Sequence, residues 1–147
     1  MLRGNHPARI DDKGRLKVPN GFRTIVEAQW GSELFVTSVT GESVRLYPMP
    51  VWLEIERRLA EVPSTHPSKQ RFLDRVNFFG QAVAMDRQGR VLVPQLLRES
   101  AAMLGEVSVL GLQNHLAVWN LKRLTDRLFK EDPFTDEDGR LLSEYGI

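Results

Sequence analysis

The sequence predicts an α+β, β-rich fold in which one structural unit is built twice. The first observation is a repeat, because the segment 10–19 recurs 75 residues later as the segment 85–94. Asp, Gly, Arg, Val and Pro keep the same mutual spacing in both copies. The second observation is that the same order of predicted elements follows each copy. A period this long, present in two copies, is typical of two fused half-domains and not of a solenoid of many short repeats.

Each repeated segment predicts a strand, a tight turn and a second strand, followed by a helix. In the first copy we expect the helix to begin at Pro19, since proline suits the first helical position, and to end at Gly31. In the second copy we expect it to begin at Pro94 and to end at Gly105. The apolar stripes behind these predictions are Phe22, Ile25 and Val26 in the first copy and Leu97, Ala101 and Leu104 in the second.

A β-hairpin is predicted after each of these helices, since β-branched and apolar residues flank a short polar turn. The expected strands are 34–39 and 44–47 in the first copy and 107–112 and 116–119 in the second, with turns at 40–42 and 113–115. Units of about 45 residues are too small to close a core alone. We therefore expect the two units to interlock into one barrel-like body.

Helices are predicted in two further regions. Between the copies, apolar residues spaced three and four apart from Trp52 to Val62 and from Phe72 to Phe79 predict two amphipathic helices, broken near residues 63–67. Their aromatic stripes indicate core or subunit contacts. One more helix is expected over 121–129. Beyond Pro133 the chain is acidic with little apolar content, and we expect this segment to be mobile.

The composition is that of an ordinary soluble globular protein, with 41% hydrophobic and 27% charged residues among 147. No apolar run approaches the roughly 20 residues of a membrane-spanning helix, so we expect no membrane partner. The absence of cysteine excludes disulfides, thiol catalysis and cysteine-ligated metals, and it fits a reducing cytoplasm.

The net charge of +1 hides an uneven distribution. Residues 1–24 hold six cations against two acids, whereas residues 131–147 hold six acids against one cation. A basic head of this kind permits a local binding site for phosphate, and solvated surface charge is the alternative interpretation.

Catalytic motifs are absent. The three histidines, His6, His66 and His115, lie far apart in the sequence and lack metal-ligand spacing. No P-loop, nucleophile elbow or dinucleotide-binding glycine motif occurs. We therefore expect no enzymatic activity, cofactor, metal or small-molecule substrate.

The repeated D-x-x-x-R turn has two interpretations. In the structural one, each aspartate accepts hydrogen bonds from backbone amides of its turn, the glycine supplies a positive φ, and the arginine pairs back with the aspartate. In the functional one, the same bonds hold a rigid basic loop that contacts nucleic acid. Phosphate repels a carboxylate and glycine has no side chain, so we expect these residues to frame the turns: Asp11, Gly14, Asp86 and Gly89. For Lys13 and Arg15 both interpretations remain open.

Arginine and a β-ribbon together favour DNA over other anions. A guanidinium can donate two parallel hydrogen bonds to guanine O6 and N7, which discriminate between bases by about 1 to 3 kcal/mol. A two-stranded ribbon is narrow enough to enter the major groove, while lysines position it on phosphates. The candidate DNA-binding residues are Arg3, His6, Arg9, Lys13, Arg15, Lys17, Arg87 and Arg90.

Ordered motifs across nearly the whole chain, the acidic tail excepted, carry a resemblance to a known family. They run from Arg3-Gly4 through Asp11-x-Lys13-Gly14-Arg15-Leu16-x-Val18-Pro19, Leu46-Tyr47-Pro48-x-Pro50-x-Trp52, Gly80-x-Ala82 and Asp86-x-x-Gly89-Arg90-x-Leu92-x-Pro94 to Glu106-Val107 and Trp119. In these motifs the chain resembles the MraZ family of bacterial regulators, which consist of two tandem SpoVT-AbrB-like half-domains.

The resemblance implies two AbrB-like swapped-hairpin β-barrel half-domains that form a pseudo-dimer, with connecting helices. The expected parts are a first half-domain over 2–52, a helical connector over 53–79, a second half-domain over 80–123, and a helix with the acidic tail over 124–147. It also implies a ring-shaped homo-oligomer in the cytoplasm, associated with the nucleoid. That oligomer would bind direct repeats of double-stranded DNA in the promoter of its own division and cell-wall gene cluster, usually as a repressor.

Two departures from the family pattern are visible. Asp12 in the first signature stands where the second has Arg87, so the two loops differ in charge. The linker 77–82 lacks the doubled glycine that related sequences often show. An alternative function is a protein-interaction module, antitoxin-like or a scaffold, whose tail from Leu121 onward wraps a partner.

Overall fold

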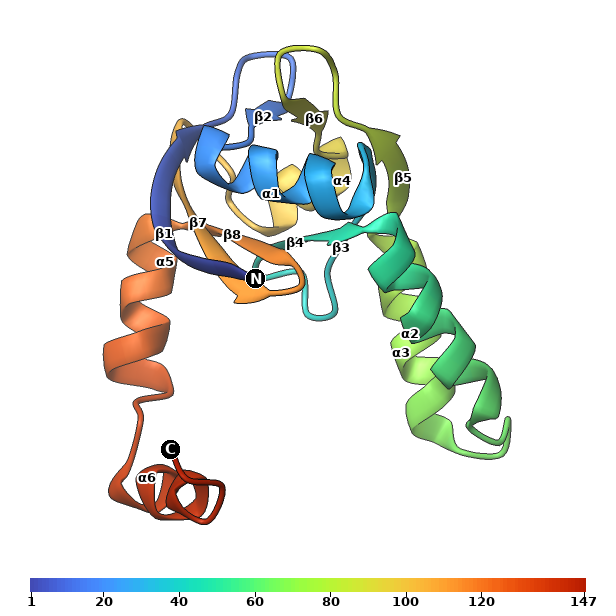
Figure 1. The fold of residues 1–147 in the computed structure, drawn as a ribbon, viewed down its shortest axis with the longest axis vertical. Coiled ribbons are helices and arrows are strands. Elements are labelled where there is room, and N and C mark those ends of the chain that lie inside the picture. Colours follow the sequence, from blue (N-terminus) through green and yellow to red (C-terminus); the bar gives the residue numbers. More distant parts are fainter.

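The computed structural model describes residues 1–147, and Figure 1 shows a β-rich body with two helical extensions. The elements are β1 (Leu2–Arg9), β2 (Arg15–Lys17), α1 (Asn20–Trp30), β3 (Glu33–Thr37), β4 (Val44–Pro48), α2 (Met49–Glu61), α3 (Pro67–Phe78), β5 (Gln81–Ala84), β6 (Arg90–Leu92), α4 (Gln95–Ser100), β7 (Glu106–Gln113), β8 (Leu116–Asn120), α5 (Leu121–Asp126), the π-helical segment η1 (Arg127–Glu131) and α6 (Asp136–Ser143). The predicted α+β class and the two predicted hairpins, β3–β4 and β7–β8, are confirmed.

The strands form two antiparallel sheets. One has six strands in the order β1-β7-β8-β4-β3-β5, and the other is the pair β2-β6. Four pairings join a strand of the first copy to a strand of the second, namely β1 with β7, β2 with β6, β3 with β5 and β4 with β8. Neither copy completes a sheet alone, so the two copies interlock through their backbones, as their small size predicts.

The main core is one cluster of 19 buried residues drawn from both copies. Leu16 and Val91, which face each other in the β2–β6 pair, are fully buried in it. Val18 and Val93 follow at the inner end of the same two strands and are buried as well. The segments that carry the repeated signature are therefore fixed from beneath by apolar side chains, and their alternate residues point outward.

Helices α1 and α4 start directly after Pro19 and Pro94, as predicted. The expected end of the second helix is wrong, because α4 ends at Ser100 and Ala102 takes a positive φ of 53°. Leu104 is consequently 82% exposed and does not belong to the apolar stripe, and Met103 is buried in the core instead.

The helical hairpin, α2 with α3, leaves the body as one of the two extensions in Figure 1, and both of its predicted helices are confirmed. Aromatic rings fix its base to the sheet. Trp52 stacks on Phe35 with ring centroids 4.6 Å apart and lies 5.1 Å from the ring of Tyr47. Val76 of α3 is buried beside them, so this end of the hairpin is held rigidly to the sheet.

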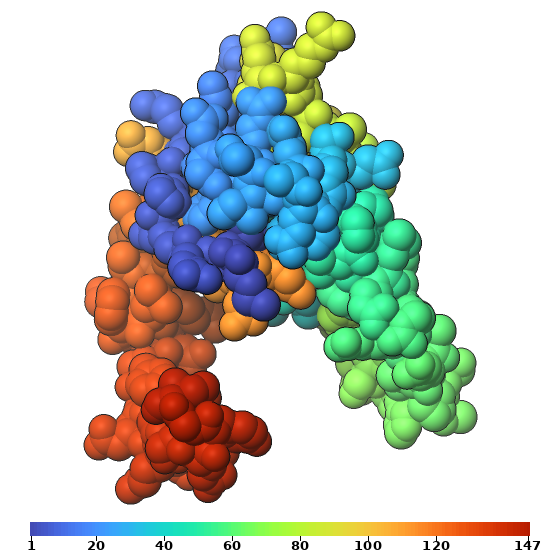
Figure 2. Space-filling model, viewed as in Figure 1, coloured from blue at the N-terminus to red at the C-terminus, as the bar shows by residue number.

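The C-terminal arm, residues 121–147, forms the other extension. The predicted helix over 121–129 is seen as α5 and η1. Arg123 attaches this part to the body by donating hydrogen bonds to the carbonyl oxygens of Glu42 and Ser100, and Arg127 forms an ion pair with Glu42. In Figure 2 the arm and the hairpin stand apart below the body.

The acidic run beyond Pro133, which we expect to be mobile, contains a helix that the sequence analysis does not predict. Residues Asp136–Ser143 form α6, whose first turn is closed by a capping box between Thr135 and Asp138. Acidic residues at a helix N-terminus also stabilise it through the helix dipole, which composition alone does not reveal.

No helix of the structure is both long and apolar enough to cross a membrane.

Candidate nucleic-acid interface

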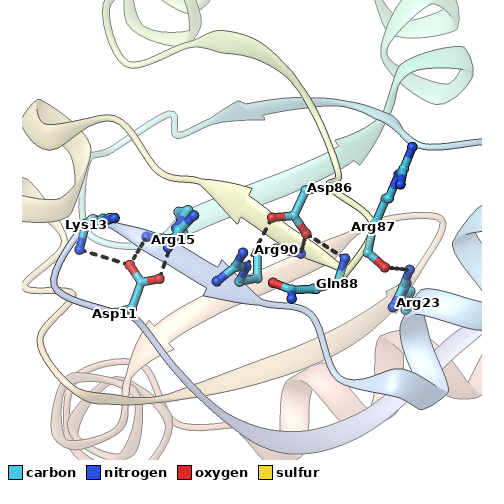
Figure 3. A network of polar contacts seen from close by, with 8 residues as sticks. All are labelled: Asp11, Lys13, Arg15, Arg23, Asp86, Arg87, Gln88 and Arg90. Carbon is cyan, nitrogen blue, oxygen red and sulfur yellow. Dashed lines mark hydrogen bonds and ion pairs between the residues drawn. The ribbon is translucent and has the colours of Figure 1, made fainter.

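The first loop, residues 11–14, is closed by the side chain of Asp11 (Figure 3). Its Oδ1 accepts hydrogen bonds from the backbone amides of Lys13, at 3.0 Å, and Arg15, at 2.9 Å. Its Oδ2 accepts a third bond from Nε of Arg15 at 3.0 Å. An aspartate that bonds the amide two residues ahead is a common turn-forming arrangement. The carboxylate is thus turned into the loop and away from any ligand outside it.

The second loop, residues 86–89, repeats this geometry. Oδ1 of Asp86 accepts from the amides of Gln88 and Arg90, both at 2.9 Å, and Oδ2 accepts from Nε of Arg90 at 3.0 Å. Figure 3 shows the two networks on neighbouring turns, and Figure 1 shows the loops side by side at the end of the body opposite the helical extensions.

Hydrogen bonding keeps both carboxylates ionised. The backbone amide of Arg15 is the main cause that lowers the pKa of Asp11 below its usual 3.8, helped by the Arg15 side chain. The amide of Arg90 lowers the pKa of Asp86 in the same way. Each arginine therefore faces a permanent negative partner at neutral pH, which fixes its position.

Each loop glycine is covered by an arginine from the other copy. Gly14 has a φ of +84°, and a Cβ there would lie 1.8 Å from Nη1 of Arg98. Gly89 has a φ of +76°, and a Cβ there would lie 2.7 Å from Cδ of Arg23. Arg98 donates to the carbonyl of Val93 at 2.5 Å. Glycine is required at both positions, for its backbone conformation and for the close approach of the guanidinium.

Arg23 and Arg98 hold the two loops in position, a role that the sequence did not reveal. Arg23 and Arg98 follow the two signatures at the same spacing, and this repeat was the sequence feature that could have identified them. Nη2 of Arg23 donates to the carbonyl oxygen of Arg87 at 2.7 Å, so a helix of the first copy holds the tip of the second loop. This contact joins residues 64 positions apart, and no local pattern encodes it.

The two loops are also joined through their backbones. The amide of Val18 donates to the carbonyl of Gly89 at 2.9 Å, and the amide of Val93 donates to the carbonyl of Gly14 at 3.0 Å. Between these bonds β2 and β6 pair in antiparallel register. Leu16 and Val91 point inward, and the residues on either side of them point outward, namely Arg15, Lys17, Arg90 and Leu92. The result is a short two-stranded ribbon with a basic outer face.

The two ribbon arginines keep part of their guanidinium groups free. The side chains of Arg15 and Arg90 are 31% and 30% exposed, and within the chain each side chain bonds through Nε alone. The two outer nitrogens form the pair of parallel donors that can read a guanine edge. Fixing Nε on a carboxylate leaves few rotamers, so these donors are held in place before any ligand arrives.

Three further predicted cations gather near the ribbon. Lys13 and Arg87 lie at the tips of the first and second loops, and Lys17 lies at the end of β2 opposite Arg90. All three side chains are exposed and form no ion pair. In Figure 2 the two loops project together from the body, which gives these cations access to an extended partner.

The remaining predicted residues lie along β1. Arg9 is exposed at the loop end of that strand, with Glu106 3.7 Å away. The ring of His6 packs edge to face on Phe22 of α1, at 4.8 Å between centroids. Arg3 lies near the N-terminus, at the other end of β1 from the loops (Figure 1). The structure therefore brings Arg9 toward the loop pair and leaves Arg3 and His6 outside it.

No group of three histidine or acidic side chains lies close enough together to hold a metal ion. The arrangement consists instead of two hydrogen-bonded turns, a ribbon with outward arginines, and exposed lysine side chains beside them. Chemically, it can bind an anionic surface that offers hydrogen-bond acceptors at fixed separations.

Comparison with known proteins identifies a family that this chain matches along nearly its whole length. A sequence model described as "MraZ protein, putative antitoxin-like" matches residues 1–75 and 79–144. The chain is 47% identical over 147 residues to Transcriptional regulator MraZ of Acidobacterium capsulatum, and the match covers all of both chains. It is 49% identical over 148 residues to that of Koribacter versatilis and 34% identical over 151 residues to that of Herpetosiphon aurantiacus, again over the full length of each. The chain therefore belongs to the MraZ family.

Proposed function

We propose that the chain is a sequence-specific DNA-binding transcriptional regulator that contacts DNA through its paired loops. The observation that carries this proposal is the β2–β6 ribbon, whose outer face presents Arg15, Lys17 and Arg90. The full-length relatives are named as transcriptional regulators and not as enzymes, which supports the same function.

The ribbon suits the major groove of DNA. Its two strands are narrow enough to enter, and the outer nitrogens of Arg15 and Arg90 would donate to guanine O6 and N7. Lys13, Lys17 and Arg87 would contact phosphates on either side and set the register without reading bases. Asp11 and Asp86 accept hydrogen bonds from their own turns, and each forms an ion pair with Arg15 or Arg90 that offsets its negative charge.

The architecture we propose is a pseudo-dimer of two swapped-hairpin half-domains, residues 2–52 and 80–123, with 53–79 as connector and 124–147 as the C-terminal part. The four strand pairings between the copies support it. The exchange of Arg23 and Arg98 between the loops supports it as well. Such an arrangement would fix the two loops at one separation, as recognition of a defined DNA site requires.

The regulator would act in the cytoplasm on the nucleoid, as a ring-shaped homo-oligomer. Several copies of the loop pair would bind successive direct repeats in the promoter of the chain's own division and cell-wall gene cluster, and so repress it. Linked sites raise the effective concentration of the next contact, so each loop pair can bind weakly while the assembly binds tightly.

A salt titration on the DNA upstream of the chain's own gene tests the proposal. Binding to that DNA should exceed binding to a scrambled duplex, and log K should fall with log salt by about 0.9 for each phosphate contact. Footprinting would then give the repeat spacing. Equal affinity for the scrambled duplex at low salt would contradict the proposal.

A protein-interaction module remains the second candidate, and one observation favours it. The C-terminal arm carries Phe129, Phe134 and Tyr145 on its surface, although large apolar residues of a monomer are normally buried.

A further inference from the structure

The outer face of the β2–β6 ribbon carries one apolar side chain among cations. Its four outward residues are Arg15, Lys17, Arg90 and Leu92. Leu92 is 41% exposed, and the first copy has Lys17 at the equivalent position. Single exposed leucines are common on protein surfaces, so the neighbours of Leu92 decide what it can bind.

The register of the ribbon places Leu92 directly opposite Arg15. In an antiparallel ladder, hydrogen-bonded pairs alternate with non-bonded pairs. The amide of Val18 donates to the carbonyl of Gly89 opposite it. Arg15 and Leu92, three positions along the ladder, therefore form a non-bonded pair. The Cβ atoms of such a pair lie about 5 Å apart on one face, so an apolar and a guanidinium side chain start from neighbouring points.

The second outward pair of the ribbon is Lys17 with Arg90. Like charges directly opposite each other destabilise an antiparallel pair, and only Arg90 has an acidic partner, Asp86. The ribbon is thus cationic at one end and combines a cation with an apolar group at the other. A row of phosphates matches the first end but gives Leu92 no apolar group to contact.

The major groove of DNA offers both kinds of contact within one base step. Guanine presents O6 and N7 to a guanidinium, and thymine alone among the four bases presents a methyl group there. Successive bases of one strand lie about 3.4 Å apart along the helix axis. A leucine whose Cβ lies about 5 Å from that of the arginine reaches the base pair beside the guanine.

We propose that Leu92 contacts the C5 methyl group of a thymine beside the guanine that Arg15 binds, so that these two residues read two neighbouring base pairs. The inference rests on the proposed DNA-binding function. At the equivalent position Lys17 offers a charge and no apolar contact, so the two halves of the ribbon read different bases. A frame with pseudo-twofold symmetry then binds an asymmetric sequence, which suits direct repeats better than palindromes.

Deoxyuridine isolates the methyl group, because it differs from thymidine only by the absence of that group. The probe is the duplex upstream of the chain's own gene that footprinting defines, with each thymine replaced in turn. Fluorescence anisotropy of the full chain should show one position in each repeat at which uracil weakens binding about fourfold, the contribution of one buried methyl group. That position should adjoin a guanine whose replacement by 7-deazaguanine weakens binding of the wild type and not of Arg15→Ala.

Variants of Leu92 assign the contact. Leu92→Ala should bind the thymine duplex about fourfold more weakly than the wild type does and should not distinguish thymine from uracil. Leu92→Lys, which copies Lys17, should also lose the distinction, while its added charge steepens the fall of log K with log salt. Leu112→Ala is the matched control, since Leu112 is also 41% exposed but lies on β7 opposite Arg3, outside the ribbon. It should keep the wild-type affinity and the wild-type response to uracil.

Several results would contradict the methyl contact. A wild type that ignores uracil at every position, a footprint without a thymine beside such a guanine, or a Leu92→Ala variant that still responds to uracil would each overturn it. A changed oligomeric state of Leu92→Ala in light scattering would assign Leu92 to a protein contact instead. Equal circular dichroism spectra of the variants and the wild type exclude misfolding.

The wild type alone separates this proposal from the DNA-binding proposal. A wild type that prefers its own upstream duplex over a scrambled one and ignores uracil keeps the regulator function and loses the methyl contact. Equal affinity for both duplexes at low salt would contradict the function itself, and the methyl contact with it.

Discussion

The first and second loops share one backbone frame and carry different side chains on it. Asp11 and Asp86 accept hydrogen bonds from corresponding atoms, with nearly the same lengths, and both loop glycines take a positive φ. On this frame Asp12 corresponds to Arg87, Lys13 to Gln88 and Lys17 to Leu92.

These substitutions move charge without changing its total. The segment 11–17 has three cations against two acids, and the segment 86–92 has two cations against one acid, so each carries one net positive charge. The loops thus differ in where their charge lies and not in its sum. The frame of each loop is fixed by the hydrogen bonds that its own aspartate accepts, while the exposed positions are free to differ.

Replacing the loop glycines should give the largest effect and show how far the frames are equivalent. Gly14→Ala should lower the free energy of unfolding by about 3 kcal/mol, because it adds backbone strain and displaces the Arg98 guanidinium from the Val93 carbonyl. Gly89→Ala should cost about 1 to 2 kcal/mol, because the flexible Arg23 side chain can move aside. Urea denaturation measures both losses.

A third glycine provides the control for this experiment. Gly21 lies in α1 with open space around it, so Gly21→Ala should stabilise the chain by about 0.5 to 1 kcal/mol. Equal losses for Gly14→Ala and Gly89→Ala would show that the covering arginines do not distinguish the two loops.

The ribbon arginines come next in expected size. Arg15→Ala should reduce affinity for the specific DNA by about 5- to 150-fold relative to scrambled DNA, the equivalent of 1 to 3 kcal/mol of base discrimination. Arg90→Ala should reduce it less, since Lys13 and Lys17 place the first loop more firmly on phosphates. Fluorescence anisotropy measures both affinities.

Arg15→Lys tests whether two parallel donors are needed. It keeps the charge and loses the planar pair of donors, so it should bind DNA but lose most of the preference. If Arg15→Ala instead unfolds the protein or breaks up its assembly, the role of Arg15 is structural.

The frame of the site was predictable because its causes are local. Asp11 contacts residues two and four positions ahead, and the same spacing recurs at Asp86, so one signature contains the whole turn. The strands and hairpins were predictable for the same reason, since alternation and turn residues are local patterns.

The remaining features depend on contacts between distant residues. Arg98 reaches Gly14 and Arg23 reaches Gly89 only after β2 and β6 have paired, and no spacing within one copy encodes that approach. Helix α6 was not predicted because we considered the acidic composition of the segment and not the capping box at Thr135. Helix α4 ends earlier than predicted because the backbone turns at Ala102, which has a positive φ.

Lowering the pH should weaken the hydrogen bonds that close both turns. The pH dependence of each turn then tests whether the two turns respond alike. The pKa of Asp11 and that of Asp86 are lowered in the folded chain, so the stability they contribute is present above their usual pKa of 3.8 and is lost as the pH falls through the folded value. Amide NMR signals of Arg15 and Arg90 should report the loss in the same pH range. Asp11→Asn should remove the response of the first loop and spare that of the second.

The smallest expected effect lies at the loop tips, where the comparison is between Lys13 and Gln88. Lys13→Ala should weaken binding to all DNA sequences and lower the slope of log K against log salt by about 0.9, because one phosphate contact is lost. Gln88→Ala should leave the slope unchanged, since glutamine carries no charge to replace a counterion. Arg87→Ala should lower it by about 0.9 only if the second loop also contacts DNA. A titration in which Lys13→Ala keeps the wild-type slope while Arg87→Ala lowers it would assign the phosphate contacts to the second loop, and the first loop would then carry its charge for another purpose.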